Sequence, residues 1–371
     1  MKSIVTDETI LREPVDRGVR LVAMSLLDDA QKAGDKLTGL SKELADGDSA
    51  ADEALHDFRV SIRRLRSWVR AFKPWIRDDL SRKQRRRLGG IADATRTIRD
   101  ATVHLEWVRK ERPALSARQR VGQTWLSERV EAERRDGADQ ALAAAADFAP
   151  RVRKLARRLE SYRASVSEVD GKKRFGAVYA ERLLKESEKL RRRLAAVHRF
   201  TDVKAAHRAR IAAKSLRYIA EPISDLLRDG DAIIETLKTL QDSLGDLHDV
   251  HIFAEELVAA TEKAAASPGL LGLGRRLRER GMRAYAEIER DWLNDAGAPF
   301  FERVRELAAD LQHRTSLGAE IEHKYLLTHL PSAVASAPSV EIEQGYLPAR
   351  NLSSASGACS SPTGQRSGSA P

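Results

Sequence analysis

Apolar residues recur every three or four positions along most of this chain, in the spacing that gives an α-helix one buried face. From about residue 13 to residue 312 this pattern is interrupted only by short segments that contain Gly, Pro or Asp. The interruptions fall at 47–49, 73–74, 112–113, 149–150, 170–171, 229–230, 267–269 and 297–299. They predict about nine or ten long helices with short connections, which favour antiparallel bundles. The fold class predicted is therefore all-α.

The helical region also repeats itself at low identity. The segment that begins at His56 aligns with the one that begins at His207, about 150 residues later. Both segments carry His, Arg, a basic residue and Arg at positions i, i+3, i+7 and i+10. We therefore expect two similar helical halves, formed by residues 12–168 and 172–315.

The pattern changes after the last predicted helix. Apolar and polar residues alternate over 319–327 and again over 340–346, which predicts two strands. Beyond them, 353–371 is rich in Ser, Gly and Ala and holds no aromatic residue. We therefore expect a short β-hairpin-like fragment at 318–348, followed by a disordered tail at 349–371.

Charge and cysteine content restrict the partners and the cellular compartment that we expect for this protein. The chain has 65 Lys and Arg against 55 Asp and Glu, a formal net charge of +10, so an acidic partner is expected. The single cysteine, Cys359, excludes a disulfide framework and a cysteine-based zinc cluster within one chain. Acidic residues stand where a signal peptide would be apolar, and no apolar run reaches about 18 residues. These features predict a soluble, cytoplasmic protein with no membrane partner.

Basic residues form a stripe along each of the two related helices. The first stripe consists of His56, Arg59, Arg63, Arg66 and Arg70, and the second of His207, Arg210, Lys214 and Arg217, with Glu221 in the place of Arg70. Like charges at this spacing repel one another, so the stripes indicate a groove that binds an anion. The alternatives are a solvated face or ion pairs with neighbouring helices. Residues 56–100 include 14 basic and only 5 acidic residues, so that segment cannot neutralise its own stripe.

The histidines and aspartates near these stripes need separate interpretations. His56 and His207 lie in the first turns of their helices, where an anion is favoured, and we interpret them as donors to phosphate oxygens rather than as packing residues. Arg99-Asp100 aligns with His248-Asp249. His248 and His251 share a helix face, but no metal is expected there. We expect both aspartates to orient an Arg or His, or to cap a helix junction.

A further basic series repeats the same spacing elsewhere. It consists of Arg182, Lys185, Lys189 and Arg192, and the run 81–87 adds more positive charge. These residues are candidates for the same groove. Glu181, Glu186 and Glu188 lie close to the series in the sequence, so ordinary surface ion pairs explain it equally well.

The duplicated His-x-x-Arg-[Val/Ile]-x-x-[Arg/Lys]-x-x-Arg helices, each followed by an [Arg/His]-Asp element, resemble the CHAD domain, the conserved histidine α-helical domain, over residues 12–315. The resemblance implies two four-helix bundles related by pseudo-twofold symmetry and a basic central surface that binds inorganic polyphosphate. It also makes an association with polyphosphate granules plausible. The segment 96–103 departs from the commoner family pattern of Gly and Asp, which leaves the role of this element open.

The segment 320–324, Glu-Ile-Glu-His-Lys, followed by 344–347, resembles the opening of a CYTH domain, the triphosphate tunnel metalloenzyme family. In such a domain Glu320 and Glu322 would hold a divalent metal such as Mg²⁺, and Lys324 would hold a triphosphate. A closed tunnel needs many more strands than 318–348 supplies, so we expect no catalysis and no cofactor. We hypothesise that the reading frame is shifted or truncated after residue 348, where the composition changes abruptly.

The sequence thus predicts a protein that binds inorganic polyphosphate in a basic groove between two helical bundles. The residues expected to bind it are His56, Arg59, Arg63, Arg66, Arg70, His207, Arg210, Lys214, Arg217, Arg182, Lys185 and Lys189. One alternative is a metal-dependent triphosphatase in which the helical region recruits substrate. The other is a nucleic-acid-binding protein, which is less expected because only 5% of the residues are aromatic and the stripes carry none.

Overall fold

A computed structural model describes residues 7–76, 80–112, 115–160, 173–261, 267–316, 342–346 and 355–359. The chain forms two compact units, Met1–Gly318 and Ala319–Pro371. The described residues of the first unit are helical, whereas the second holds a two-stranded antiparallel sheet. The predicted all-α class is therefore confirmed. None of the described helices is both long enough and apolar enough to cross a membrane.

The helices divide between the two halves of the repeat. The first half contains η1 (Glu8–Arg12), α1 (Val15–Gly39), α2 (Ser41–Asp46), α3 (Ser49–Ala71), α4 (Lys73–Ile76), α5 (Arg82–Ala94), α6 (Arg96–Glu111) and α7 (Ala117–Glu160). The second half contains α8 (Phe175–Leu194), α9 (Val203–Ala220), η4 (Glu221–Leu226), α10 (Gly230–Thr261), α11 (Ser267–Trp292) and α12 (Ala298–Ser316).

Most predicted interruptions lie at helix ends. Gly47 ends α2 with a φ of 82°, a left-handed conformation that glycine adopts without strain, and the Asp48 side chain then caps α3. Pro150 is the exception, because α7 continues through it to Glu160. Phe148 and Val152, on either side of the proline, are both buried in the core. Their packing offsets the one backbone hydrogen bond that the proline removes. The pair 170–171 lies outside the described residues.

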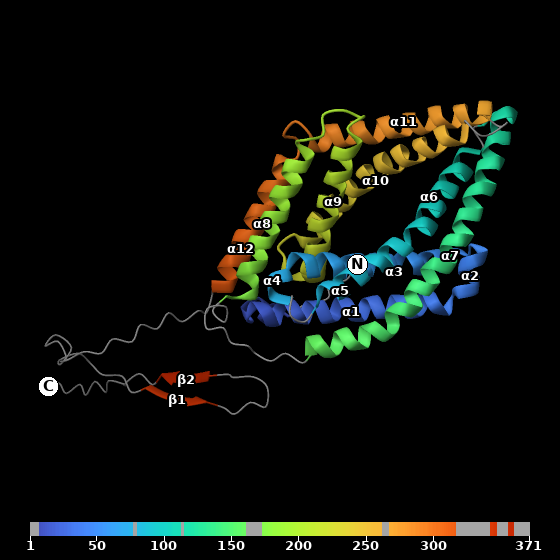
Figure 1. Cartoon of the computed structure of the whole chain (residues 1–371). Coiled ribbons are helices and arrows are strands. Elements are labelled where there is room, and N and C mark those ends of the chain that lie inside the picture. The colour runs from blue at the N-terminus through green and yellow to red at the C-terminus, as the bar shows by residue number, and fades with distance from the viewer. Residues whose placement is uncertain are drawn as a thin grey trace, which may run out of the picture. The chain divides into compact units, whose positions relative to one another are not determined.

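Helices at corresponding positions of the two halves pack against one another. α1 packs on α8, α3 on α9, and α7 on α11. In Figure 1 the helices of this unit run along four sides, with α1 and α3 below, α6 and α7 on the right, α10 and α11 above, and α8, α9 and α12 on the left. The two halves also exchange backbone hydrogen bonds, from Val15 N to Lys173 O at 3.1 Å and from Phe175 N to Glu13 O at 2.9 Å.

Two hydrophobic clusters hold the helical unit together. The larger one runs through both halves, and its centre is aromatic. There Trp68 donates a hydrogen bond from its indole nitrogen to Val19 O, and Tyr179 donates one to Ile219 O, both at 3.0 Å. The smaller cluster joins α6 and α7 to α10 and α11. Because both clusters contain residues from each half, the two halves are packed as one folded unit.

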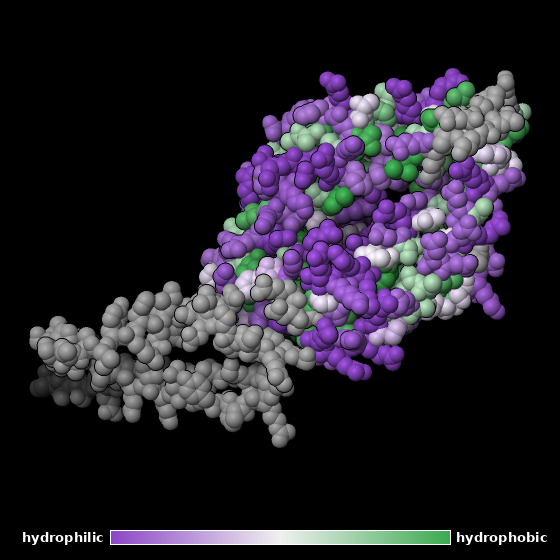
Figure 2. Space-filling model, in the orientation of Figure 1, coloured by the Kyte–Doolittle hydropathy of each residue, from purple (hydrophilic) through white to green (hydrophobic). Residues whose placement is uncertain are grey.

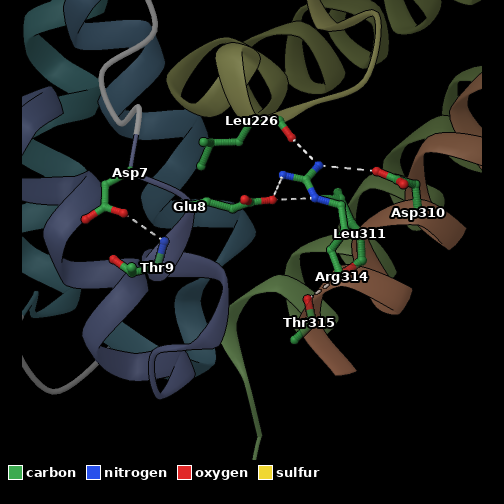
Figure 3. A network of polar contacts seen from close by, with 8 residues as sticks. All are labelled: Asp7, Glu8, Thr9, Leu226, Asp310, Leu311, Arg314 and Thr315. Atoms are coloured by element: carbon green, nitrogen blue, oxygen red, sulfur yellow. Dashed lines mark hydrogen bonds and ion pairs between the residues drawn. The ribbon is translucent and has the colours of Figure 1, made fainter. Parts of the chain in front are cut away.

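The N-terminal residues belong to this unit as well. Ile10 and Leu11 of η1 are buried in the larger cluster, so the folded unit begins before the predicted boundary at residue 12. Arg314, at the end of α12, forms an ion pair with Glu8 and donates to Leu226 O at 2.7 Å and to Asp310 at 3.2 Å (Figure 3). These contacts connect the first element to the last helix.

The second unit contains β1 (Ile342–Tyr346) and β2 (Ala355–Cys359), paired from Ile342–Cys359 to Tyr346–Ala355. β1 confirms the strand predicted at 340–346. β2 lies in the segment predicted to be disordered, and that prediction is wrong over 355–359. Strand pairing uses backbone groups, so small residues such as Ala, Ser and Gly suffice. The strand predicted at 319–327 and its motif residues Glu320, Glu322 and Lys324 lie outside the described residues.

Candidate anion-binding groove

A groove with a volume of about 960 Å³ lies between α3, α6, α9 and α10. In Figure 2 the helical unit is hollowed near its centre, and mostly hydrophilic side chains surround the hollow. The cations that line the groove are Arg59, Arg63, Arg64, Arg96, Arg99, Arg210, Lys214, Arg217 and Lys238. Its acidic lining residues are Asp100, Glu221, Asp231, Glu235, Asp242 and Asp249. The lining therefore carries a net positive charge.

The structure brings the two predicted stripes together. The residues of both stripes that line this groove are His56, Arg59, Arg63, His207, Arg210, Lys214 and Arg217. They meet because α3 and α9 pack directly against each other, each with its apolar face in the core. The stripe of one helix therefore faces the stripe of the other across the groove.

Five other predicted residues lie away from the groove lining: Arg66, Arg70, Arg182, Lys185 and Lys189. Arg66 lies beside Gly89 of α5, because the C-terminal part of α3 packs against α5 rather than against the groove. Arg182 and Lys189 each pair with the buried Glu186, at 3.0 Å in both cases. The ion-pair interpretation therefore describes these two residues of the α8 series.

Arg59 and Arg210 are cations with incomplete hydrogen bonding. Arg59 is only 3% exposed, and its Nη1 has no hydrogen-bond partner among the described residues. Burial, reinforced by Arg63, lowers the pKa of Arg59 to about 9. Burial also lowers the pKa of Arg210, whose buried Nε lacks a partner in the same way. A buried polar atom without a partner is costly, so both groups are suited to donate to an anionic acceptor.

Lys214 adds a third desolvated cation. Burial lowers its pKa well below the ordinary value, and the positive charges of Arg210 and Arg63 lower it further. The two aligned aspartates act in the opposite direction, since Asp100 raises the pKa of Arg59 and Asp249 raises that of Arg210. Each aspartate thus lies near the arginine of its own half, in agreement with an orienting role.

The histidines of the groove meet mainly in the second half. His207 Nδ1 lies 3.4 Å from His248 Nδ1, so one ring donates and the other accepts. Burial lowers the pKa of His207, with Arg210 and Lys214 contributing. Burial, followed by Arg210 and His207, lowers the pKa of His248 to about 3. Desolvation and then Arg99 lower the pKa of His56 on the opposite wall. These rings are therefore neutral near pH 7.

The described part of the chain contains no group of three or more His, Cys, Asp or Glu that is arranged to hold a metal ion. His251, which shares a helix face with His248, packs against the ring of Phe200 with centroids 5.1 Å apart. It does not line the groove. The nearby carboxylate Asp249 faces the arginine-rich wall, where it interacts with Arg210.

One end of the groove contains an ion-paired carboxylate that connects the two halves. Arg64 of α3 donates from Nε to Glu221 Oε2 at 2.6 Å, and Arg217 Nε lies 3.0 Å from Glu221 Oε1. The second contact has ion-pair distance but not hydrogen-bond geometry, because that Nε remains without a hydrogen bond. Arg217, predicted to bind phosphate, is therefore already paired with a carboxylate.

Sequence reasoning missed several lining residues. Arg96 and Arg99 of α6 supply two cations to the groove. In the sequence, the alignment of Arg99-Asp100 with His248-Asp249 pointed to this region. That alignment placed the two elements at equivalent positions of the repeat, but it did not identify Arg96 or Arg99 as ligand-binding residues. Arg64 carried no such signal, because it lies next to Arg63 in the sequence and outside the i, i+3, i+7 spacing.

Comparison with known proteins agrees with this geometry. The family model described as CHAD domain matches residues 30–258, which is more than half of the chain. This chain belongs to the CHAD domain family. The crystal structure of the CHAD domain from the plant Ricinus communis matches with a TM-score of 0.54 and 16% identity, covering 83% of this chain and 96% of that one. At that identity the likeness shows the fold of this CHAD domain. No curated protein matches the chain.

Proposed function

We propose that this CHAD domain binds inorganic polyphosphate along the groove between α3, α6, α9 and α10. The observation that carries the proposal is the pair of desolvated, incompletely bonded cations, Arg59 and Arg210, one from each half. Phosphate oxygens would supply the missing acceptors through charge-assisted hydrogen bonds, which are stronger than neutral ones. The groove is thus arranged for a negatively charged ligand that reaches both halves at once.

The distribution of charge within the groove supports an elongated ligand that lies along its cationic walls. The cations on α3, α6 and α9 outnumber the acids there, because the carboxylates Glu221, Asp231, Glu235 and Asp242 come from η4 and α10. A linear polyanion can therefore lie along the cationic walls and avoid the acidic end. A compact dianion would need only part of this surface.

The aromatic residues that line the groove favour polyphosphate over nucleic acid as its ligand. Proteins that bind single strands stack bases on exposed aromatic rings. Tyr218 is the aromatic residue other than histidine among the described lining residues, and it is 3% exposed. Arg217 also covers the Tyr218 ring, with its guanidinium carbon 5.1 Å from the ring centroid. Among its described lining residues the groove therefore offers cations to phosphates but no exposed Phe, Tyr or Trp ring for bases.

Competition binding tests this proposal. Labelled long-chain polyphosphate is titrated against the full chain at fixed, moderate salt, with unlabelled polyphosphate or single-stranded RNA as competitor. The variant Arg59→Ala with Arg210→Ala removes one cation from each half. The control, Arg109→Ala with Arg191→Ala, removes two charges from exposed ion pairs outside the groove.

We expect the groove variant to lose at least about tenfold in polyphosphate affinity, because two charge-assisted contacts are removed. The control should stay within about twofold, and RNA should compete poorly. Equal competition by RNA, or equal losses in both variants, would show that binding depends only on net charge and would contradict the proposal.

A further inference from the structure

The helical unit has a second basic pocket, on α5 and α7. Its volume is about 220 Å³, and it shares no lining residue with the central groove. Its cationic lining residues are Lys83, Arg87, Arg151, Lys154 and Arg158, and its floor is formed by Leu88, Ile91, Phe148 and Leu155. The basic run 81–87, a candidate for the groove from sequence alone, thus contributes to a separate site.

Three of these five cations have no partner within the described part of the chain. Arg151 is ion-paired with Asp147, and Arg158 donates to Gln84 at 3.3 Å. Lys83, Arg87 and Lys154 form neither a hydrogen bond nor an ion pair there. Lys83 and Arg87 are four residues apart on one helix, a spacing at which like charges repel each other.

The two segments that supply the cations of the pocket contain no acidic residue. Residues 82–87 and 151–158 together hold ten Lys or Arg and no Asp or Glu. Most of these side chains are exposed, and the two segments lie on helices that pack against each other. The charge is therefore concentrated on one concave surface instead of being spread over the molecule, which lowers the cost of bringing an anion close.

From these observations we propose that the α5–α7 pocket is a second binding site for a phosphate chain. The inference rests on the proposed function, because it assigns the same ligand class to a second surface. The small concave pocket fits a short stretch of phosphates, whose oxygens would pair with Lys83, Arg87 and Lys154. α5, which lines the pocket, packs against both α3 of the groove and α7. A long chain that passes around α5 can occupy both sites, whereas a short chain fills only one.

Chain-length dependence gives the test. Isothermal titration is carried out on the full chain with a short polyphosphate and with a long one, and again on the pocket variant Lys83→Ala, Arg87→Ala and Lys154→Ala. The control variant Arg109→Ala, Arg191→Ala and Arg290→Ala removes three charges from exposed ion pairs. The groove variant Arg59→Ala with Arg210→Ala is included for comparison, and circular dichroism verifies that each variant is folded.

For the wild type and the control we expect two short chains per protein and at least about tenfold tighter binding of the long chain, because the second contact is intramolecular. The pocket variant should bind one short chain and lose the advantage of the long chain, while the groove variant should keep one weak site.

A wild-type stoichiometry of one that the pocket variant leaves unchanged would overturn the second site without affecting the groove. If binding survives only at the pocket, the groove proposal fails instead.

Discussion

The buried arginines of the groove favour ligand binding over stability of the empty protein. Arg59 is almost fully buried, and one of its terminal nitrogens lacks an acceptor. Arg134 is buried to a similar extent, but it donates to Leu44 O at 3.0 Å and to Asp52 at 2.9 Å. Arg134 thus has its hydrogen bonds satisfied, whereas Arg59 does not. Of these two buried arginines, only Arg59 faces the groove.

We predict that Arg59→Met makes the empty protein more stable by about 1–2 kcal/mol, because a desolvated cation is replaced by an apolar chain of similar length. The same variant should bind polyphosphate at least about tenfold more weakly. Urea unfolding and a binding titration measure the two effects. Arg134→Met serves as the matched control and should destabilise the protein, because it leaves Asp52 unpaired. A less stable Arg59→Met protein would contradict this account.

The groove histidines should link binding to pH. Near pH 7 His207 and His248 are neutral, because their pKa values are lowered by burial and by Arg210. A bound polyanion brings negative charge beside them and raises these pKa values, so binding takes up protons. We therefore expect polyphosphate affinity to increase as the pH falls from about 7.5 to about 5.5. The variant His207→Gln with His248→Gln should lose most of this pH dependence, and an unchanged slope would disprove the linkage.

The lowered pKa values of these two histidines also determine how the folding stability of the protein changes with pH. A histidine with a lowered folded-state pKa binds fewer protons than it does in the unfolded chain, so it makes folding less favourable once the pH drops below about 6.5. The empty protein should therefore lose stability through His207 and His248 as the pH falls below that value. Thermal unfolding across this range, with and without polyphosphate, should show a smaller loss for the complex.

Among the elements, α3 and η4 are joined by the pair Arg64–Glu221, which connects the first half to the second. We predict that Glu221→Gln destabilises the protein by about 3 kcal/mol, because it leaves the buried Arg64 and the partly buried Arg217 without their shared carboxylate. Polyphosphate should raise the melting temperature of this variant more than that of the wild type. The control Glu188→Gln, which disrupts an exposed pair with Arg191, should change stability by less than about 1 kcal/mol. Equal effects would contradict the bridging role.

Helix ends were predictable where local chemistry determines them. The ends near Gly47 and Gly230 follow from glycine and a neighbouring Asp, which favour turns. Pro150 was misread, because buried residues on both sides of it hold α7 together. The run 81–87 could not be placed from sequence, since the helix neighbours of α5 decide which cavity it lines, and those neighbours come from distant parts of the chain.

At the scale of the whole helical unit, most of the correct predictions follow from the internal sequence repeat. Two similar helices with the same stripe predicted a shared groove, and the packing of α3 on α9 forms it. The stripe alone did not show where the groove ends. Arg66 and Arg70 continue the pattern past the point where α3 leaves the groove. The pairing of Glu221 with Arg64 was also hidden, because Arg64 comes from the other half of the chain, whereas the pairing of Glu221 with Arg217 is local.

The most direct test of the central claim is a crystal structure of the full chain with a polyphosphate of defined length. We predict phosphates along α3 and α9, with oxygens about 3 Å from Nη1 of Arg59 and from Nε of Arg210. His207 and Lys214 should lie beside the same chain of phosphates. A structure in which phosphates occupy only outer surfaces, while both arginines keep their unpartnered atoms, would contradict the account.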